Sequence, residues 1–450
     1  MPNTSEIMRL TLIQPCVGKS NGQKDYIKTW QMEPLPPAII ASLTPKDVEI
    51  KFYDDRIEDI PYEEKTDLVG ISVETYTAKR SYQIASEYRK RGIPVLMGGF
   101  HPTLIPNEVI NYADHVVIGE IECIWKDIIT DFKNKRAKKV YKVNKRPNLE
   151  KIFPDRTIYK NKKYLNFGLV ETGRGCIFKC DFCSITNFYK HTYNYRPIKD
   201  VIKEIKSLGN KYYFFVDDNI CSDVKRAKEL FKALIPLKIK WVSQGSIHMA
   251  NDKELLELMK KSGCECILIG FESLSSKTLR SMNKWVNLST NRDLAIKKIH
   301  GAGIKIYATF IFGYDTDSIN SFRETYNFAV KHKFFLAAFN HLIPFPGTPL
   351  YKRLKSEKRL LDEKWWLNNS YTFGDVPFKP KNFTSKQLSL LCYKYRKKFY
   401  TASSLFYRMF NFKTNFSSLN SYYVYLFVNF LSKIDINKRQ GLCLGINGGN

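Results

Sequence analysis

Short apolar segments alternate with longer segments of helical character along the first 145 residues. The short segments are rich in β-branched residues, which is typical of strands. The predicted strands are 9–14, 48–53, 68–73, 95–97 and 115–118. The predicted helices are 38–43, 78–91, 107–112 and 121–133. This alternation predicts a parallel sheet covered on both faces, as in a Rossmann-like domain spanning residues 1–145.

Several of these strands end in polar or glycine-containing turns, at residues 14–15, 74–75, 98–102 and 119–120. In an open α/β sheet, ligands bind in the crevice at the carboxyl ends of the strands. Glycines at that edge let a bulky ligand approach the backbone. The sequence contains no G-x-G-x-x-G, so a dinucleotide is not supported.

A second strand–helix series follows a lysine-rich stretch of mixed polarity, residues 146–168, which we interpret as a linker. The predicted strands are 169–172, 212–216, 240–244, 266–270, 305–310 and 337–342. The predicted helices are 198–208, 224–233, 252–261, 275–282, 290–301 and 318–331. Six βα units predict an incomplete (β/α)6 barrel over residues 169–375, with its chemistry at the carboxyl ends of the strands.

The composition is that of a globular protein, but its charge is strongly positive. Lys and Arg exceed Asp and Glu by 28, which favours an anionic partner such as nucleic acid, a membrane surface or a phosphorylated substrate. Residues 376–450 carry twelve of the basic residues and one acid, Asp435, interleaved with aromatic residues. The chain start lacks a secretory signal pattern, and no uncharged apolar run reaches about 18 residues. We therefore expect a cytoplasmic protein without an ordinary membrane-spanning helix.

Three of the ten cysteines crowd into eight positions directly after the first strand of the second series. Cys176, Cys180 and Cys183 have the spacing C-x3-C-x2-C, which indicates metal ligation in a reducing compartment. Three thiolates on one loop can bind three irons of a [4Fe–4S] cluster and leave the fourth iron open to a substrate or cofactor. Zinc is the alternative, but structural zinc needs four N or S ligands, and no second Cys or His pair has suitable spacing.

This triplet, with an aromatic residue before its last Cys at the start of a βα barrel, resembles the radical S-adenosylmethionine (SAM) enzymes. The resemblance implies that the three cysteines bind a [4Fe–4S] cluster whose open iron chelates SAM, and that cleavage of SAM gives a 5′-deoxyadenosyl radical. Residues 344–350 resemble the last barrel loop of that family. The implied SAM contacts are Phe182, Asp217, Asp218, Asn219, Gln244, Glu272 and Gly313. Asp217, Asp218 and Glu272 have a structural alternative, since each could cap the following helix.

A Rossmann-like domain ahead of such a barrel resembles the cobalamin-binding subclass, in the branch that contains hopanoid methylases and the anaerobic magnesium-protoporphyrin cyclase. The resemblance extends over nearly the whole chain, including a mainly helical C-terminal segment. The implied cobalamin contacts are Gln14, Asp55, Arg56, Ser72, Glu74, Thr75, Gly98, Gly99, His101, Gly119 and Glu120.

One departure concerns the lower ligand of cobalt. Many cobalamin domains supply a His in D-x-H-x-x-G, but the corresponding residues 54–59 contain no His. Bound cobalamin would lack that ligand, a pattern shared by this branch. His101 is the nearest alternative ligand, although a His before Pro in a glycine-rich turn more often shapes the backbone or contacts a ligand. Loss of cobalamin binding also stays open.

Two other features each have more than one interpretation. Cys264 and Cys266, with Cys221, could form a second cluster, but at the beginning of an apolar strand buried thiols are favoured. Residues 422–431 are apolar or aromatic except for one Asn and are too short to span a bilayer. They predict either a packed C-terminal helix or an interfacial helix at a membrane. Stacking on single-stranded nucleic acid is disfavoured, because the tail contains no RNA-binding module.

The favoured function is cobalamin-dependent methylation of an unactivated carbon in a hydrophobic, lipid or isoprenoid-like substrate. The resemblance implies an electron donor such as flavodoxin or ferredoxin, and the tail suggests peripheral contact with the inner face of a membrane. Cyclisation or C–C bond formation would use the same residues. An RNA-modifying methylthiotransferase would carry a second N-terminal cysteine cluster, where this chain has only Cys16 and Cys123. A non-catalytic cobalamin module would not need the triplet.

Overall fold

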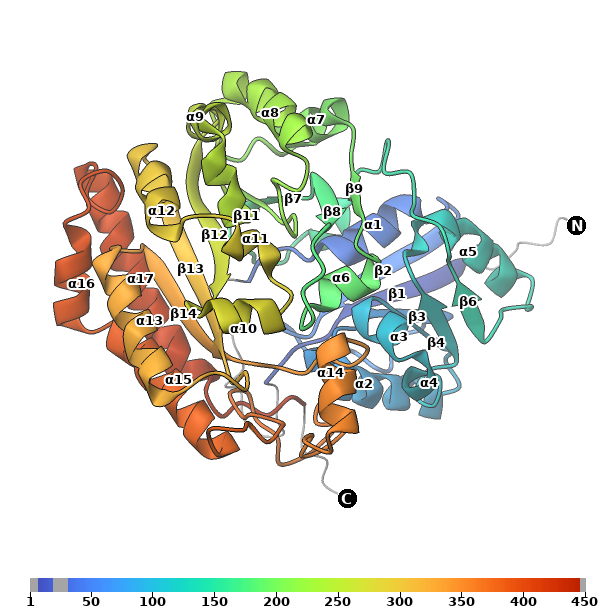
Figure 1. Cartoon of the computed structure of the whole chain (residues 1–450). Coiled ribbons are helices and arrows are strands. Elements are labelled where there is room, and N and C mark those ends of the chain that lie inside the picture. The colour runs from blue at the N-terminus through green and yellow to red at the C-terminus, as the bar shows by residue number, and fades with distance from the viewer. Residues whose placement is uncertain (1–6, 19–30, 446–450) are drawn as a thin grey trace, which may run out of the picture. The chain divides into compact units, whose positions relative to one another are not determined.

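A computed structural model describes residues 7–18 and 31–445 of the chain (Figure 1). These residues form two compact units. Unit 1 combines the described residues up to 165 with the returning segments 364–372 and 442–445, and unit 2 combines residues 166–363 with 373–441. Unit 1 is therefore discontinuous in sequence. The domain bounds proposed from the sequence alone stay a prediction.

Unit 1 contains a six-stranded parallel sheet in the order β2-β1-β3-β4-β5-β6. Its strands are β1 (Met8–Gln14), β2 (Val48–Asp54), β3 (Leu68–Ser72), β4 (Val95–Gly98), β5 (His115–Ile118) and β6 (Val140–Lys142). Its α-helices are α1 (Leu35–Leu43), α2 (Ala78–Lys90), α3 (Phe100–Leu104), α4 (Pro106–Val109) and α5 (Trp125–Lys133). Its 3-10 helices are η1 (Thr75–Thr77), η2 (Ile121–Cys123) and η3 (Arg156–Tyr159). The predicted Rossmann-like fold is confirmed.

Two parts of unit 1 differ from the sequence prediction. The edge strand β6 was missed, because its three residues bury only Tyr141 and so carry no apolar pattern. Residues 98–102, expected as a turn, instead lead directly into helix α3. The glycine before that helix is required by the backbone: Gly99 has φ of +108°, and a Cβ there would lie 3.0 Å from the carbonyl oxygen of Val73.

Unit 2 contains a second six-stranded parallel sheet, in the order β14-β13-β12-β11-β10-β7, and a separate antiparallel hairpin, β8–β9. The sheet strands are β7 (Gly168–Val170), β10 (Tyr212–Phe215), β11 (Lys240–Gly245), β12 (Cys264–Glu272), β13 (Lys305–Phe312) and β14 (Leu336–His341). The hairpin strands are β8 (Gly173–Gly175) and β9 (Tyr193–Tyr195). Helices between successive strands are α7 (Ile198–Leu208), α8 (Val224–Leu234), α9 (Lys253–Lys261), α10 (Ser276–Ser281), α11 (Trp285–Leu288), α12 (Arg292–Gly301) and α13 (Ile319–Lys331). The partial barrel is confirmed.

Helix α7 shows why these segments are helical. Val201 and Ile205 lie one turn apart and are buried against the sheet, which gives the helix an apolar stripe. The helix ends at Gly209, whose left-handed φ of +64° a glycine adopts without strain. The apolar stripes of such helices pack against strands such as β12 and β13, and together they form one continuous apolar core in unit 2. Cys221 and Cys264 belong to that core, which favours buried thiols over a second cluster.

The C-terminal segment is mainly helical, as predicted. It contains α15 (Ser385–Phe399), α16 (Ala402–Met409) and α17 (Leu419–Arg439) after the shorter α14 (Pro349–Ser356). Helix α15 packs along β14, the edge strand of the barrel sheet, and α17 packs against α15 and α16 (Figure 1). Among the described residues, no helix combines the length and the apolar character needed to cross a membrane.

Candidate active site

The cysteine loop runs from the end of β8 to α6 (Ser184–Phe188). Cys183 is the N-cap residue of α6, and its carbonyl oxygen accepts hydrogen bonds from the side chains of Thr186 and Asn187. Gly175 precedes the loop with φ of +96°, and a Cβ there would lie only 2.2 Å from the carbonyl oxygen of Thr192 in the turn before β9. The hairpin therefore requires glycine at this position and fixes where the loop begins.

The polar residues after β10 pack behind this loop. Asp218 accepts a hydrogen bond from the backbone N–H of Gly175 at 2.7 Å. The Asn219 amide lies 4.0 Å from the Cys176 sulfur and donates to the Ser246 hydroxyl at 3.0 Å. The side-chain carbonyl oxygen of Asn219 (Oδ1) is buried without a hydrogen-bond partner among the described residues. This orphan acceptor beside the cysteine loop fits a ligand that donates an N–H, as the amino group of SAM does.

Asp217, which was expected to contact SAM, makes hydrogen bonds within the protein. It is fully buried and accepts from both the backbone N–H and the hydroxyl of Thr172, at 2.7 and 2.6 Å. Burial raises the pKa of its carboxyl to about 7. Asp217 therefore joins the ends of β7 and β10, and its predicted contact with SAM stays a prediction.

The helix-cap alternatives considered for these acids are wrong. The N-cap residue of α8 is Asp223, which bonds the backbone of Arg226, so neither Asp217 nor Asp218 caps that helix. The N-cap residue of α10 is Ser275, so Glu272 does not cap it.

Glu272 ends β12 and faces a lysine that the sequence analysis did not single out. Its carboxylate forms an ion pair of 3.1 Å with Lys284, and both side chains are largely buried. Glu272 has φ of +60°, a strained conformation for a residue with a side chain, at the point where the β12–β13 register shifts. The pKa of the Lys284 ammonium is raised despite its burial, because Glu272 and the thiols of Cys180 and Cys183 lie around it.

The segment after β13 is tied back to the cysteine loop. Asp317 accepts from the backbone N–H groups of Gly313 and Tyr314, at 2.9 and 3.0 Å. The Tyr314 hydroxyl donates to Asp181, which lies within the loop, at 2.6 Å. Gly313 has φ of +116°, and a Cβ there would lie 2.7 Å from Leu388. Phe182, the aromatic residue before Cys183, packs partly buried against the core of unit 2.

The donor chemistry of this site fits an iron–sulfur cluster. Cys180 is buried, and burial raises the pKa of its thiol to about 12, so a thiolate there needs cationic compensation from iron and from Lys284. Among the described residues, no three His, Cys, Asp or Glu side chains converge on a point that could hold one metal ion. A cubane makes no such demand, because each of its irons takes a single thiolate. Gln244, at the end of β11, is half-buried.

Lys284 is expected to tune the reduction potential of the cluster. Lys284→Met removes a cation beside Cys180 and Cys183, so the reduced, more negative cluster should be harder to form. We expect the midpoint potential to fall by tens of millivolts in a titration followed by electron paramagnetic resonance. Lys277→Met removes an exposed cation on α10 and should leave the potential unchanged. An unchanged or higher potential in Lys284→Met would contradict this role.

The predicted cobalamin contacts share the carboxyl edge of the unit 1 sheet. Gln14, Ser72 and Gly98 end β1, β3 and β4, and Glu74 and Thr75 follow β3. They lie at the edge where parallel sheets bind their ligands. Gly119 follows β5 with φ of +99°, and its N–H donates to the Thr103 hydroxyl at 2.9 Å. Glu120 is buried in an ion pair with Arg146. Their contacts with cobalamin stay predictions.

The acidic residues at the end of β2, Asp54 and Asp55, form internal ion pairs. Asp55 is fully buried, and the Arg80 guanidinium donates to its two oxygens at 2.7 and 2.8 Å. Arg56 pairs with Asp54 at 2.6 Å, and the Tyr164 hydroxyl donates to the same carboxylate oxygen. The stretch that supplies a histidine ligand in other cobalamin domains therefore forms ion pairs within unit 1.

His101 is fully buried in a polar network. Its Nδ1 lies 3.3 Å from the Thr75 hydroxyl, and its Nε2 lies 3.1 Å from the Tyr82 hydroxyl and 3.2 Å from the Glu108 carboxylate. Trp366 donates its indole N–H to the same Glu108 oxygen at 2.9 Å. Burial lowers the pKa of His101 against the opposing effect of the Glu108 carboxylate, which favours the neutral ring. Because both ring nitrogens have protein partners, the structure favours the shaping role of His101 over cobalt ligation.

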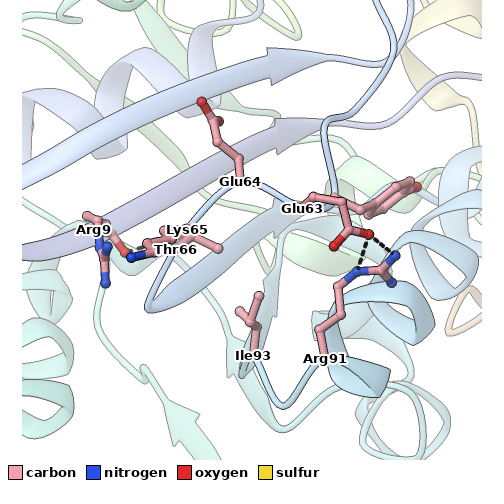
Figure 2. Close-up of a pocket in the computed structure, with 8 residues that line it drawn as sticks. Arg9, Glu63, Glu64, Lys65, Thr66, Arg91 and Ile93 are labelled. Atoms are coloured by element: carbon pink, nitrogen blue, oxygen red, sulfur yellow. Dashed lines mark hydrogen bonds and ion pairs between the residues drawn. The ribbon is translucent and has the colours of Figure 1, made fainter.

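Figure 2 shows a pocket of about 260 Å³ in unit 1. Arg9 lies near the beginning of β1, Thr66 precedes β3 and Ile93 precedes β4, so the pocket is at the amino edge of the sheet. Arg91 and Glu63 of its lining form an ion pair at 2.6 Å, and Arg9 and Glu64 pair with Asp67 and Lys51 outside it. This edge is opposite to the one where parallel sheets bind their ligands.

Comparison with known proteins matches both units. Residues 170–329 match the radical SAM superfamily, and residues 39–127 match the B12 binding domain. The chain is 33% identical to bacteriochlorophyllide d C-12(1)-methyltransferase of Chlorobaculum tepidum over 389 residues, which cover 84% of each protein. It is 26% identical to the anaerobic magnesium-protoporphyrin IX monomethyl ester cyclase of Cereibacter sphaeroides, over 75% of this chain and 60% of that one.

A solved structure shares the fold. The radical SAM methyltransferase TsrM from Kitasatospora setae, with cobalamin and a [4Fe–4S] cluster bound, superposes with a TM-score of 0.61. The match covers 78% of each chain at 17% sequence identity.

Proposed function

Because the chain belongs to the cobalamin-binding radical SAM enzymes, we propose that it methylates an unactivated carbon of a hydrophobic small molecule. Its cofactors are a [4Fe–4S] cluster, SAM and cobalamin. The observation that carries the proposal is the three-cysteine loop, backed by Asp218 and Asn219, in a chain that also contains a B12 binding domain. Relatives that bear the name methyltransferase support the reaction type.

The reduced cluster, when bound, supplies the electron that cleaves SAM, and cobalamin supplies a methyl group. Cys176, Cys180 and Cys183 would hold three irons, and the loop conformation is set by the Gly175–Asp218 hydrogen bond. Asn219 would present its unpaired carbonyl oxygen to the amino group of SAM. Lys284 would offset the negative charge of the thiolates.

The names of two relatives support the proposed substrate class. The two relatives act, by name, on bacteriochlorophyllide d and magnesium-protoporphyrin IX monomethyl ester, so hydrophobic tetrapyrroles join lipids and isoprenoid-like molecules as candidates. A reductant is required, and the excess of 28 positive charges would suit an acidic electron carrier such as flavodoxin or ferredoxin. Nucleic acid is disfavoured as a substrate.

Cyclisation is the second candidate, because one relative is named a cyclase. The two reactions differ in how SAM is consumed. With reconstituted enzyme, reductant, cobalamin and a candidate substrate, methylation should release S-adenosylhomocysteine together with 5′-deoxyadenosine. Cyclisation should release 5′-deoxyadenosine without S-adenosylhomocysteine. Product mass, higher by one methylene for methylation, provides an independent check, and formation of neither nucleoside with any substrate would contradict both reactions.

A further inference from the structure

Helix α17 buries polar residues and exposes apolar ones, the reverse of an ordinary surface helix. Three of its buried positions, Ser421, Tyr425 and Asn429, are spaced by about one turn, and Asp435 is buried further along the helix. Its large exposed apolar residues are Leu419, Tyr423, Val424, Leu426, Phe427 and Phe430. Five of these, at 419, 423, 426, 427 and 430, recur at helical spacing and therefore share one side of the helix.

Polar contacts hold the buried side of α17 to the barrel. Arg408 of α16 is fully buried, donates to the Asn429 side chain at 3.2 Å and lies 3.7 Å above the centre of the Phe399 ring. The Asn429 amide in turn donates to the carbonyl oxygen of Phe335, beside β14, at 3.2 Å. The Tyr425 hydroxyl donates to the carbonyl oxygen of Leu405 at 2.9 Å. These contacts fix the orientation of α17, so its apolar side faces away from the barrel.

The exposed apolar surface continues from α17 onto α16. A chain of ring contacts with centroids 5.0 to 6.2 Å apart links the aromatic residues Phe406, Phe410, Phe412, Phe416, Tyr422 and Tyr423. We call the exposed residues of both helices and their connection the outward face. Its members, each between 37% and 69% exposed, are Phe406, Tyr407, Phe412, Leu419, Tyr423, Val424, Leu426, Phe427 and Phe430. Apolar residues in one continuous surface, unlike scattered ones, mark an interaction site.

The charges of the C-terminal segment that carries the outward face, residues 376–450, are almost all positive. Lys413, Lys433 and Lys438 are exposed on α17 and on the segment before it. Asp435 is the only acid among residues 376–450, and it is buried beside Arg439, 3.6 Å away. A second copy of the chain would bring the same lysines against each other across a two-fold interface. An anionic surface would instead neutralise them.

We propose that the outward face binds the surface of an anionic lipid bilayer. The helix lies in the interfacial plane, with Phe427, Phe430 and Tyr423 among the acyl chains and the lysines at the headgroups. The 21-residue α17 stays at the interface, because its other side carries Asn429 and Asp435 and is held by the barrel. This contact goes beyond the proposed reaction and would let the enzyme collect hydrophobic substrates from a membrane.

Flotation of the full-length holoenzyme with vesicles tests the proposal. Wild-type protein should float with vesicles of phosphatidylcholine and phosphatidylglycerol and should float poorly with phosphatidylcholine alone. Replacing Tyr423, Phe427 and Phe430 together by Ser should weaken binding to the anionic vesicles by roughly tenfold or more. Replacing Lys413, Lys433 and Lys438 together by Glu should have a similar effect, which high salt reproduces in the wild type.

A matched control separates this surface from general hydrophobicity. Tyr212→Ser with Ile235→Ser changes exposed apolar residues elsewhere in unit 2 and should float like the wild type. Iron content and 5′-deoxyadenosine formation in detergent-free buffer show that each variant is folded, so failure of the methylation proposal would not affect the result. Equal flotation of wild type and outward-face variants, or flotation of neither, overturns the proposal. So does a wild-type dimer, seen in sedimentation, that becomes monomeric in the Tyr423, Phe427 and Phe430 variant without any vesicle binding.

Discussion

Cys180→Ala should lose the iron–sulfur cluster and, with it, all formation of 5′-deoxyadenosine. The wild type, reconstituted without oxygen, should contain about four irons per chain, because three thiolates and an open fourth iron complete one cubane. Cys180 is the middle ligand and the one buried most deeply, at 6% exposure. Alanine leaves two thiolates, which cannot hold three irons. Iron and sulfide analysis, visible absorbance and a dithionite-driven SAM cleavage assay measure the loss.

The control for Cys180 is Cys392→Ala. Cys392 is also buried, in α15, and its thiol pKa is likewise raised to about 12 by burial, but it lies outside the triplet. This variant should keep its iron and its activity, so a general effect of removing a buried thiol would show there. A Cys180→Ala protein that still binds four irons and cleaves SAM would refute the assignment of the cysteine loop.

Arg408→Met should destabilise unit 2 by about 3 kcal/mol. This is the largest stability effect that we expect from replacing one residue of the C-terminal helices. Arg408 donates to the carbonyl oxygens of Phe334, Phe335 and Phe399 at 2.8 to 3.2 Å. Methionine has a similar length but no donors, so these buried acceptors would lose their partners. The unfolding free energy in urea and the thermal midpoint would both decrease.

Two further variants define the role of Arg408. Arg408→Lys keeps the charge but lacks the planar fork, so it should recover only part of the stability. Lys386→Met removes an exposed cation of α15 and should change the unfolding free energy by less than about 0.5 kcal/mol. Wild-type stability in Arg408→Met would show that the guanidinium does not anchor α16 and α17.

The sequence predicts the two sheets well, because both are parallel and buried. Strands such as 115–118 and helices such as 198–208 have the predicted bounds, since continuous apolar runs and amphipathic stripes are strong local signals. The C-x3-C-x2-C spacing likewise lies within eight residues. The hairpin β8–β9 was missed, because its strands, Gly-Arg-Gly and Tyr-Asn-Tyr, are three residues each and too short to give a strand pattern in the sequence.

The remaining site features depend on contacts between residues far apart in the sequence. Tyr314 reaches Asp181 across 133 positions, and Asn219 reaches Cys176 across 43. No local pattern marks Lys284, which follows a short helix and becomes relevant only through Glu272 and the cysteines. The different roles of Asp217 and Asp218 also follow from burial: one joins two strands, and the other holds the cysteine loop. The sequence alone cannot assign different roles to two adjacent aspartates, because their partners are known only from the folded structure.

The discontinuity of unit 1 has a consequence for its biosynthesis. Trp366, which donates to Glu108 from 258 positions downstream, leaves the ribosome only after all of the barrel strands and the helices between them. Cys443, which forms an antiparallel β-bridge with Thr372, is synthesised later still, and so is Leu442, whose side chain lies next to Gly18. The amino-terminal sheet therefore stays incompletely packed until residues 364–372 and 442–445 have been synthesised, and a fragment cut at residue 165 for modular exchange with another enzyme would have an incomplete core.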